Sequence, residues 1–289
     1  MADASDTIPK AAGPKAAGPK APGPKTRGRG RSPLWTFRGT LPRGVQAAAG
    51  IGTSLALLLL WEAAARSGLV NTTFLPPPSR VAEAGLLMVQ KQDLLWHAGV
   101  STLRVWAAFA LAAAMAIPIG ILMSSYRVVG AALEPVIDFI RYLPVPALVP
   151  LSIIWFGVGE TTKLYLLWLG TFFQLVLLVA DDMRRVPQEY VEIAYTLGAN
   201  TRQVLRDVAY KAMLPGLVDN LRITLGWCWT YLIIAEIVAA DSGIGFVIWT
   251  ARRYMKTPEV MAGVLAIGII GLLTDQLLRA LHRRAFRYL

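Results

Sequence analysis

The chain has 289 residues, of which 55% are hydrophobic and 16% are charged, and its formal net charge is +11. A soluble domain carries about a quarter charged residues, so this composition excludes an ordinary soluble protein and indicates a polytopic helical membrane protein. The positive charge could suit nucleic acid, but Lys and Arg gather at the chain ends and in one loop, which membrane topology explains better. The single cysteine, Cys228, excludes an intrachain disulfide.

The N-terminal segment is basic and repetitive. Residues 9–25 read PKAAGPKAAGPKAPGPK, a five-residue repeat that cannot bury a hydrophobic core and that lacks the apolar stretch of a signal peptide. We therefore expect residues 1–45 to form a disordered cytoplasmic tail and residues 46–289 to form one transmembrane domain.

Six apolar stretches are long enough to cross a bilayer as helices, which takes about 20 residues each. They are residues 46–66, 98–124, 132–157, 161–180, 214–240 and 258–281. If the N-terminus is cytoplasmic, the inner loops and chain ends, with the adjoining ends of the spans, carry 19 Lys and Arg residues, and the outer loops with their adjoining span ends carry 7. This excess predicts that both termini are cytoplasmic.

Two expected outer loops have distinctive sequences. The prolines of LPPPSR favour an extended segment, and Ser79 within it is placed to cap a short outer helix. A later outer loop carries Arg252, Arg253 and Lys256. It could attract an anionic solute or an acidic docking surface, or be an ordinary solvated loop.

The third stretch contains Pro144, Pro146 and Pro150, and each of them removes a backbone donor from an apolar segment. Such breaks are tolerated where neighbouring protein or a water-lined path satisfies the freed carbonyls. We expect a hinge or cavity wall here, and a packed kink is the alternative.

Charged side chains inside a membrane cost some ~2.5–3.5 kcal/mol each on insertion scales and therefore suggest function. Asp138 and Arg141 could neutralise each other, or Arg141 could face an anionic solute, while Arg104 and Glu236 could form an interhelical pair or contact the solute. The aromatic cluster of the fifth stretch could line a path, form a dimer seam or simply pack. The candidate pathway and hinge residues are Arg141, Pro144, Pro146, Pro150, Trp227, Thr230, Tyr231 and Glu236. No residues have metal-ligand spacing, so no metal site is predicted.

The polar loop of residues 182–212 is predicted to fold as two short helices. Gly198 suits a left-handed helix end, and Asn200 with Gln203 resembles a capping box that begins the second helix. That helix is expected to end before Pro215, where the fifth span begins. The loop could be a DNA-binding helix-turn-helix, an amphipathic or structureless segment, or a docking element for a partner protein.

The pattern Glu192-Ile193-Ala194-x-x-x-Gly198 resembles the EAA loop of binding-protein-dependent ABC importer permeases, although isoleucine stands where the family usually has alanine. The segment RYLPVPALVPLSIIWFGVGE, together with LPPPSRV and GIIGLLTDQLLRALHRR, is similar to signatures of the sulfonate, nitrate and taurine branch. The order and spacing of these pieces make the resemblance specific, and it covers most of the chain after the tail.

The resemblance implies an all-α MetI-like permease fold of about six transmembrane helices, in the bacterial inner membrane, with a cytoplasmic coupling helix. It also implies a second permease copy, two ABC ATPase subunits that bind ATP and Mg, a periplasmic solute-binding protein and surrounding lipid, with no nucleic acid and no cofactor on this chain. The residues expected to contact the ATPase are Glu189, Glu192, Ala194, Gly198, Ala199 and Arg202.

The sequence contains no Gly-Lys pair, so the phosphate-binding loop GxxxxGK[ST] is absent and the chain cannot power transport alone. We expect a non-catalytic permease subunit that imports a small solute, such as the anions nitrate and aliphatic sulfonates, or taurine. One alternative is an ion-coupled secondary transporter or channel, which would call for buried acidic relays and inverted repeats. A non-transport scaffold is a further alternative.

Overall fold

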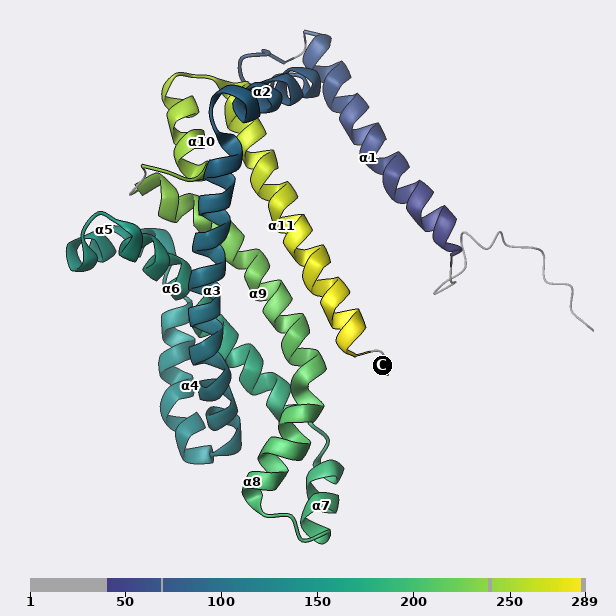
Figure 1. Ribbon diagram of the computed structural model, residues 1–289, viewed down its shortest axis with the longest axis vertical. Coiled ribbons are helices and arrows are strands. Elements are labelled where there is room, and N and C mark those ends of the chain that lie inside the picture. The colour runs from purple at the N-terminus through teal and green to yellow at the C-terminus, as the bar shows by residue number, and fades with distance from the viewer. Residues whose placement is uncertain (1–40, 69, 239–240, 287–289) are drawn as a thin grey trace, which may run out of the picture. The chain divides into compact units, whose positions relative to one another are not determined.

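The computed structural model describes residues 41–68, 70–238 and 241–286 (Figure 1). Most of the predicted basic tail therefore lies outside the described residues. The secondary structure that is described is helical, as predicted. In chain order it comprises α1 (Arg43–Arg66), α2 (Pro78–Lys91), α3 (Leu94–Ser125), α4 (Arg127–Arg141), α5 (Val145–Phe156), α6 (Glu160–Arg184), α7 (Gln188–Thr196), α8 (Thr201–Gln203), a π-helical turn (Val204–Ala209), α9 (Tyr210–Val238), α10 (Ile244–Arg253) and α11 (Thr257–Ala285).

Within the described ranges, four helices are long and apolar enough to cross a membrane: α1, α3, α6 and α11. The bent pair of α4 and α5 makes a fifth span if it is counted as one. The remaining predicted stretch forms α9, which has 29 residues but is not among these helices. Asp219, Arg222 and Glu236 lie within it.

The third predicted stretch is not one continuous helix, and it breaks at its prolines as the sequence indicated. α4 and α5 are bent by 100° relative to each other at a short break. Pro144 lies at this break in an extended conformation, and Pro146 falls in the first turn of α5. A proline is tolerated in a first helical turn because its missing N–H has no intrahelical partner there in any case. Of these three prolines, only Pro150 lies inside a helix beyond its first turn.

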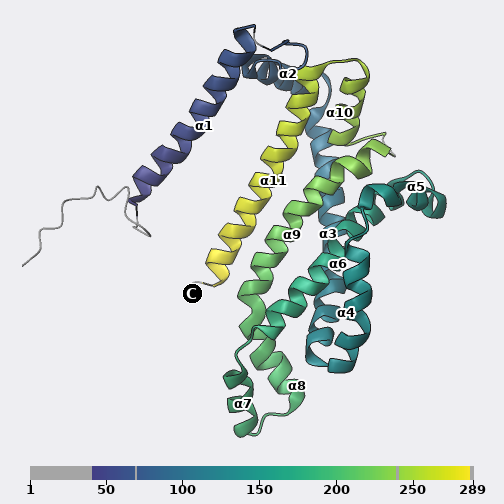
Figure 2. The same ribbon diagram turned by 180° about the vertical axis from the view of Figure 1, so that it is seen from behind.

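The chain divides into two units, residues 1–57 and 58–289. The described part of the first unit is the first section of α1, whose side chains are exposed. In the second unit, α3, α6 and α9 lie against one another (Figures 1 and 2). Buried apolar side chains fill the space between them. Gly120 allows α3 to approach α6 closely, since a Cβ there would lie 2.7 Å from the Val176 carbonyl oxygen.

The second unit has two recognisable ends. α2 and α10 lie together at one end, and α7 and α8 lie at the other, as both views show (Figures 1 and 2). We call them the α10 end and the α7 end. α9 runs from the α7 end to the α10 end, with α11 beside it on the way back.

The polar loop at the α7 end folds largely as predicted. Gly198 ends the first helix with φ at +84°. The Asn200 side chain accepts from the Gln203 N–H at 3.0 Å and the Gln203 side chain accepts from the Asn200 N–H at 2.8 Å, which confirms the capping box. The predicted break before Pro215 is wrong, because the second helix continues through the π-helical turn into α9. Packing of this segment against α6 outweighs the one hydrogen bond that a proline removes.

The start of α2 also differs from the prediction. The extended residue before it is Pro77, whose own side chain has no acceptor with which to cap the helix. Ser79 lies in the first turn, where its backbone N–H donates to the Glu62 carboxylate at 3.1 Å. The polyproline segment is therefore anchored to α1 rather than capped by its own serine.

Candidate functional site

At the α7 end, helix α7 presents an apolar stripe to solvent. Tyr190, Ile193 and Leu197 are 53%, 58% and 82% exposed, and their spacing of three and four residues puts them on one helical face. Apolar side chains exposed together in a polar loop are typical of a surface that binds another protein. Sequence reasoning concentrated on the small residues of this loop, and the same helical spacing applied to the large ones would have found the stripe.

The predicted coupling residues are not all at the surface. Glu189, Glu192 and Arg202 are exposed, and so is Gly198 at the turn. Ala194 is buried against its own chain. The exposed isoleucine that departs from the family pattern projects outward instead, beside the exposed acids.

A small cavity lies where α4 breaks into α5. Its volume is about 60 Å³, and α6 and α9 complete its wall. Among the lining side chains are Arg141, Gln174, Trp227 and Tyr231. The cavity thus brings three predicted pathway residues together from α4 and α9 and adds Gln174, which sequence reasoning missed.

Arg141 has partners on its own helix and still lines the cavity. Its Nε lies 3.1 Å from the Asp138 carboxylate, and its Nη2 donates to the Tyr142 hydroxyl at 3.1 Å. The ion pair agrees with the first alternative from the sequence, mutual neutralisation. The guanidinium also borders the cavity, and its contact with a solute stays a prediction.

Two other groups at the cavity have no protein partner. Gln174 and the Tyr231 hydroxyl form no hydrogen bond with any described residue. Gly170 lets the Tyr231 ring lie against α6, because a Cβ at that position would come within 2.5 Å of the ring. Polar groups with unused hydrogen-bonding capacity beside a cavity are available to a polar ligand. Thr230 lies outside this lining and donates to the Trp227 carbonyl at 2.7 Å.

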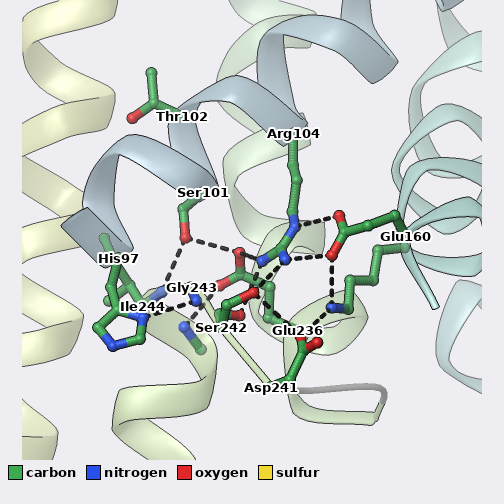
Figure 3. A network of polar contacts seen from close by, with 12 residues as sticks. His97, Ser101, Thr102, Arg104, Glu160, Glu236, Asp241, Ser242, Gly243 and Ile244 are labelled. Carbon is green, nitrogen blue, oxygen red and sulfur yellow. Dashed lines mark hydrogen bonds and ion pairs between the residues drawn. The ribbon is translucent and has the colours of Figure 1, made fainter. Parts of the chain in front are cut away.

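At the α10 end, a buried polar network joins α3, α6, α9 and the start of α10 (Figure 3). Its centre is Arg104, which is 4% exposed. Its Nε and Nη2 donate to the two Glu160 oxygens at 2.7 and 2.5 Å, and its Nη1 donates to Glu236 at 2.8 Å. Two further bonds reach the Ser242 carbonyl at 2.9 Å and hydroxyl at 2.6 Å. All five N–H donors of the guanidinium are therefore used.

Glu236 connects the network to α10. It is fully buried, and one carboxylate oxygen accepts from the Ser101 hydroxyl while the other accepts from the Gly245 N–H, each at 2.7 Å. The Ser101 hydroxyl in turn accepts from the Ile244 N–H at 2.9 Å. The first N–H groups of a helix have no intrahelical partners and favour a nearby negative charge, so these side chains cap α10.

Glycine is required where the chain turns into α10. Gly243 has φ at +101°, and a Cβ there would overlap the Glu236 carboxylate. Its N–H donates to His97 Nδ1 at 3.0 Å. At Gly245 a Cβ would lie 2.5 Å from the Glu236 Cβ. The loop before α10 therefore fits closely around this carboxylate.

A buried lysine extends the network toward the surface. Lys163 Nζ donates to Glu160 and to Asp241 Oδ1, both at 2.9 Å. The hydrogen bond from Lys163 lowers the pKa of the exposed Asp241 carboxyl to about 2. The Arg104–Glu236 pair agrees with the interhelical pairing considered from sequence, whereas the roles of Lys163 and Asp241 were missed. Across the described residues, no three His, Cys, Asp or Glu side chains are grouped as a metal site would require.

Long apolar helices, a broken span beside a small polar cavity and an exposed polar loop between two long helices are typical of an integral membrane permease. The comparisons with known proteins place it further. Residues 116–287 match the family of the "binding-protein-dependent transport system inner membrane component", and the chain belongs to this family.

Two curated relatives are similar over most of their length. The taurine transport system permease protein TauC of Escherichia coli K12 is 37% identical over 84% of this chain and 90% of its own. The putative aliphatic sulfonates transport permease protein SsuC of Bacillus subtilis 168 is 30% identical over 80% of this chain and 84% of its own.

A solved structure, titled as an inward-facing conformation of the MetNI methionine ABC transporter, resembles the fold. Its TM-score is 0.53 with 20% identity, over 67% of this chain and 97% of that one. The expected ABC permease fold is therefore confirmed. Family membership also supports a permease subunit of an ABC importer over the two alternatives, an ion-coupled transporter and a scaffold.

Proposed function

We propose that this permease works as a pair of identical copies, with two ATPase subunits docked on α7 and a solute-binding protein at the α10 end. In this arrangement the α7 end and both chain termini are cytoplasmic, in agreement with the distribution of Lys and Arg. ATP binding and hydrolysis occur on the ATPase subunits, since this sequence lacks the phosphate-binding loop.

The observation that carries this proposal is the exposed stripe of Tyr190, Ile193 and Leu197 on a family member's EAA loop. An apolar helix face can lie in a groove of a partner protein, and Glu189 and Glu192 beside it can orient that contact. Movement of the docked helix would pass through the Gly198 turn to α8, which continues through the π-helical turn into α9. ATP binding then biases the permease between two conformations, which requires a different contact in each.

A matched pair of substitutions tests the docking surface. Leu197→Asp should abolish co-purification of the ATPase, because a charge in an apolar groove has no partner there. Val128→Asp is the control, since Val128 is 83% exposed near the start of α4 and outside the loop, and it should retain the ATPase. Normal ATPase recovery with Leu197→Asp would refute the docking role of the stripe.

For the solute, we propose a small molecule with a sulfonate or similar anionic head group. Relatives named for taurine and aliphatic sulfonates support this class. The cavity at the break between α4 and α5 offers the Arg141 guanidinium, the Gln174 amide and the Tyr231 hydroxyl to such a group. Its volume of about 60 Å³ suits a head group rather than a whole solute.

The solute class is tested by calorimetric titration of the solute-binding protein encoded beside this chain with taurine, longer sulfonates, nitrate, bicarbonate and an uncharged control. Tight binding of only the uncharged compound would refute the anion proposal and leave the permease assignment intact. For the cavity, Arg141→Gln should reduce uptake into proteoliposomes at least about tenfold, a loss of about 1.4 kcal/mol or more. Arg279→Gln, which removes an arginine in α11 that pairs with Asp275 on its own helix, should transport normally.

A further inference from the structure

We propose that the loop joining α10 to α11 is a docking surface for an acidic patch on the solute-binding protein, and that α10 transmits the contact to the network around Arg104. This inference rests on the proposed function, because it takes the α10 end to face the compartment that contains the binding protein. It assigns a role to the basic outer loop and to the network, neither of which the coupling loop or the cavity explains.

The loop carries positive charge that the protein itself does not neutralise. Lys256 pairs with Glu259 at 3.0 Å. Arg252 and Arg253 are exposed and have no ion pair with any residue that the structure describes. The Arg252 guanidinium lies over the Trp249 ring, 4.8 Å from its centroid, so it is held in place while its edge stays available to a carboxylate.

The residue types around these charges match a protein interface better than a site for a small anion. Aromatic residues, Met and Arg are the types that protein interfaces contain in excess. Here Trp249, Arg252, Arg253 and Met255 line one hollow of about 440 Å³. Tyr254 beside them is 69% exposed, as is Met255. A partner that buries such side chains and supplies carboxylates to the arginines would satisfy both parts of the surface.

The loop has a fixed shape. Tyr254 and Lys256 donate their N–H groups to the Ala251 carbonyl at 3.2 and 3.0 Å, and Met255 donates to the Arg252 carbonyl at 3.0 Å. Met255 turns the chain with φ at +55°, a left-handed conformation that few non-glycine residues adopt. Because the surface is already ordered, a partner loses little affinity in ordering it.

α10 connects this loop directly to the network. The helix has 10 residues, so its ends are about 15 Å apart. Val247, Ile248 and Ala251 bury one face of it along its length. Its start is fastened by the Ile244 N–H to Ser101 of α3 and by the Gly245 N–H to Glu236 of α9. A force on the loop therefore reaches α3 and α9 through a short buried helix with no flexible linker.

Docking is tested by measuring the Kd between the purified permease–ATPase complex and the solute-binding protein, by surface plasmon resonance at low and high salt. The double variant Arg252→Glu with Arg253→Glu should raise the Kd at least about tenfold and flatten its salt dependence. The control is Arg283→Glu with Arg284→Glu, an equal charge change on an exposed arginine pair at the other end of α11, and it should bind as the wild type does.

Equal binding by wild type and the Arg252/Arg253 variant would overturn the docking surface, and so would equal weakening by both double variants. If uptake falls while the Kd is unchanged, the loop acts on the solute or on lipid and the inference is wrong. Failure of the wild-type complex to bind the protein at all would instead count against the proposed function.

Transmission is tested with Ser101→Ala, which removes the hydroxyl between Ile244 and Glu236 and leaves the loop intact. We expect an unchanged Kd. We also expect the binding protein to stimulate ATP hydrolysis several-fold less than it does in the wild type, measured as the ratio of the rates with and without it. Ser124→Ala is the control, because the Ser124 hydroxyl bonds only within α3, at 3.0 Å to the Ile121 carbonyl. If Ser101→Ala keeps the wild-type stimulation ratio, the proposed transmission through α10 is wrong. It is also wrong if Ser101→Ala raises the Kd as much as the Arg252/Arg253 variant does.

Discussion

Replacing each of the two carboxylates that bind Arg104 should have unequal effects on stability. Glu236→Ala and Glu160→Ala both leave the guanidinium with one carboxylate, but Glu236 is fully buried whereas the Glu160 side chain is 55% exposed. Breaking a buried pair costs about 3–5 kcal/mol, a fully exposed pair contributes about 1 kcal/mol or less, and the half-exposed Arg104–Glu160 pair falls between these limits. Glu236→Ala also leaves the Gly245 N–H and the Ser101 hydroxyl without their acceptor.

The lone cysteine provides the assay. Cys228 is fully buried in α9, so a thiol-reactive fluorescent dye reports unfolding of the purified protein in detergent. At about 2–4 °C per kcal/mol, Glu236→Ala should lower the midpoint by roughly 6–20 °C and Glu160→Ala by a smaller amount. Equal shifts for the two variants would refute the reasoning, because they would mean that burial does not decide how much each ion pair contributes to stability.

Further predictions concern the glycines and the acidic loop before α10. Gly243→Ala should destabilise the protein by about 1–3 kcal/mol in the same melting assay, because Gly243 has a positive φ and an added Cβ would overlap Glu236. Gly268→Ala is the control, because an added Cβ there meets open space, and it should be neutral or stabilise by about 0.5–1 kcal/mol. A pKa of about 2 for Asp241, against 3.8 ordinarily, means that its ionised form stabilises the fold above about pH 4 and that this contribution is lost as the pH falls toward 2. The melting difference between wild type and Asp241→Asn should therefore be constant from pH 7 to about 4 and vanish near pH 2, and its persistence there would contradict the lysine pairing. Gly120→Ala should separate α3 from α6 and broaden the size-exclusion peak, because the added Cβ would lie 2.7 Å from an α6 carbonyl oxygen.

The sequence predicted those features that depend on local chemistry. The turn at Gly198 and the capping box of Asn200 and Gln203 are set by residues within a few positions of one another, and the structure confirms both. The helical class and the apolar stretches follow from composition in the same way. The continuation of the loop helix past Pro215 was missed because packing against α6, and not the proline itself, decides whether the helix ends there.

The networks depend on contacts between residues far apart in sequence. Arg104 and Glu236 are 132 residues apart, and only the fold brings Asp241 to Lys163. An isolated intramembrane charge indicates that a partner exists, but spacing along the chain cannot identify it. The 100° bend between α4 and α5 was likewise beyond the sequence, since prolines predict a break and not its angle.

The uninterrupted course of α9 has a geometric consequence. Its 29 residues measure about 43 Å, which exceeds the roughly 30 Å of hydrocarbon in a bilayer. A tilt of only about 5° about one end of such a length displaces the other end by about 4 Å, roughly 70% of the 5.4 Å rise of one helical turn. Angular changes too small to unpack a helix from its neighbours are thus amplified into displacements large enough to open or close a path for a small solute. A helix divided at Pro215 would have absorbed such a tilt at the joint.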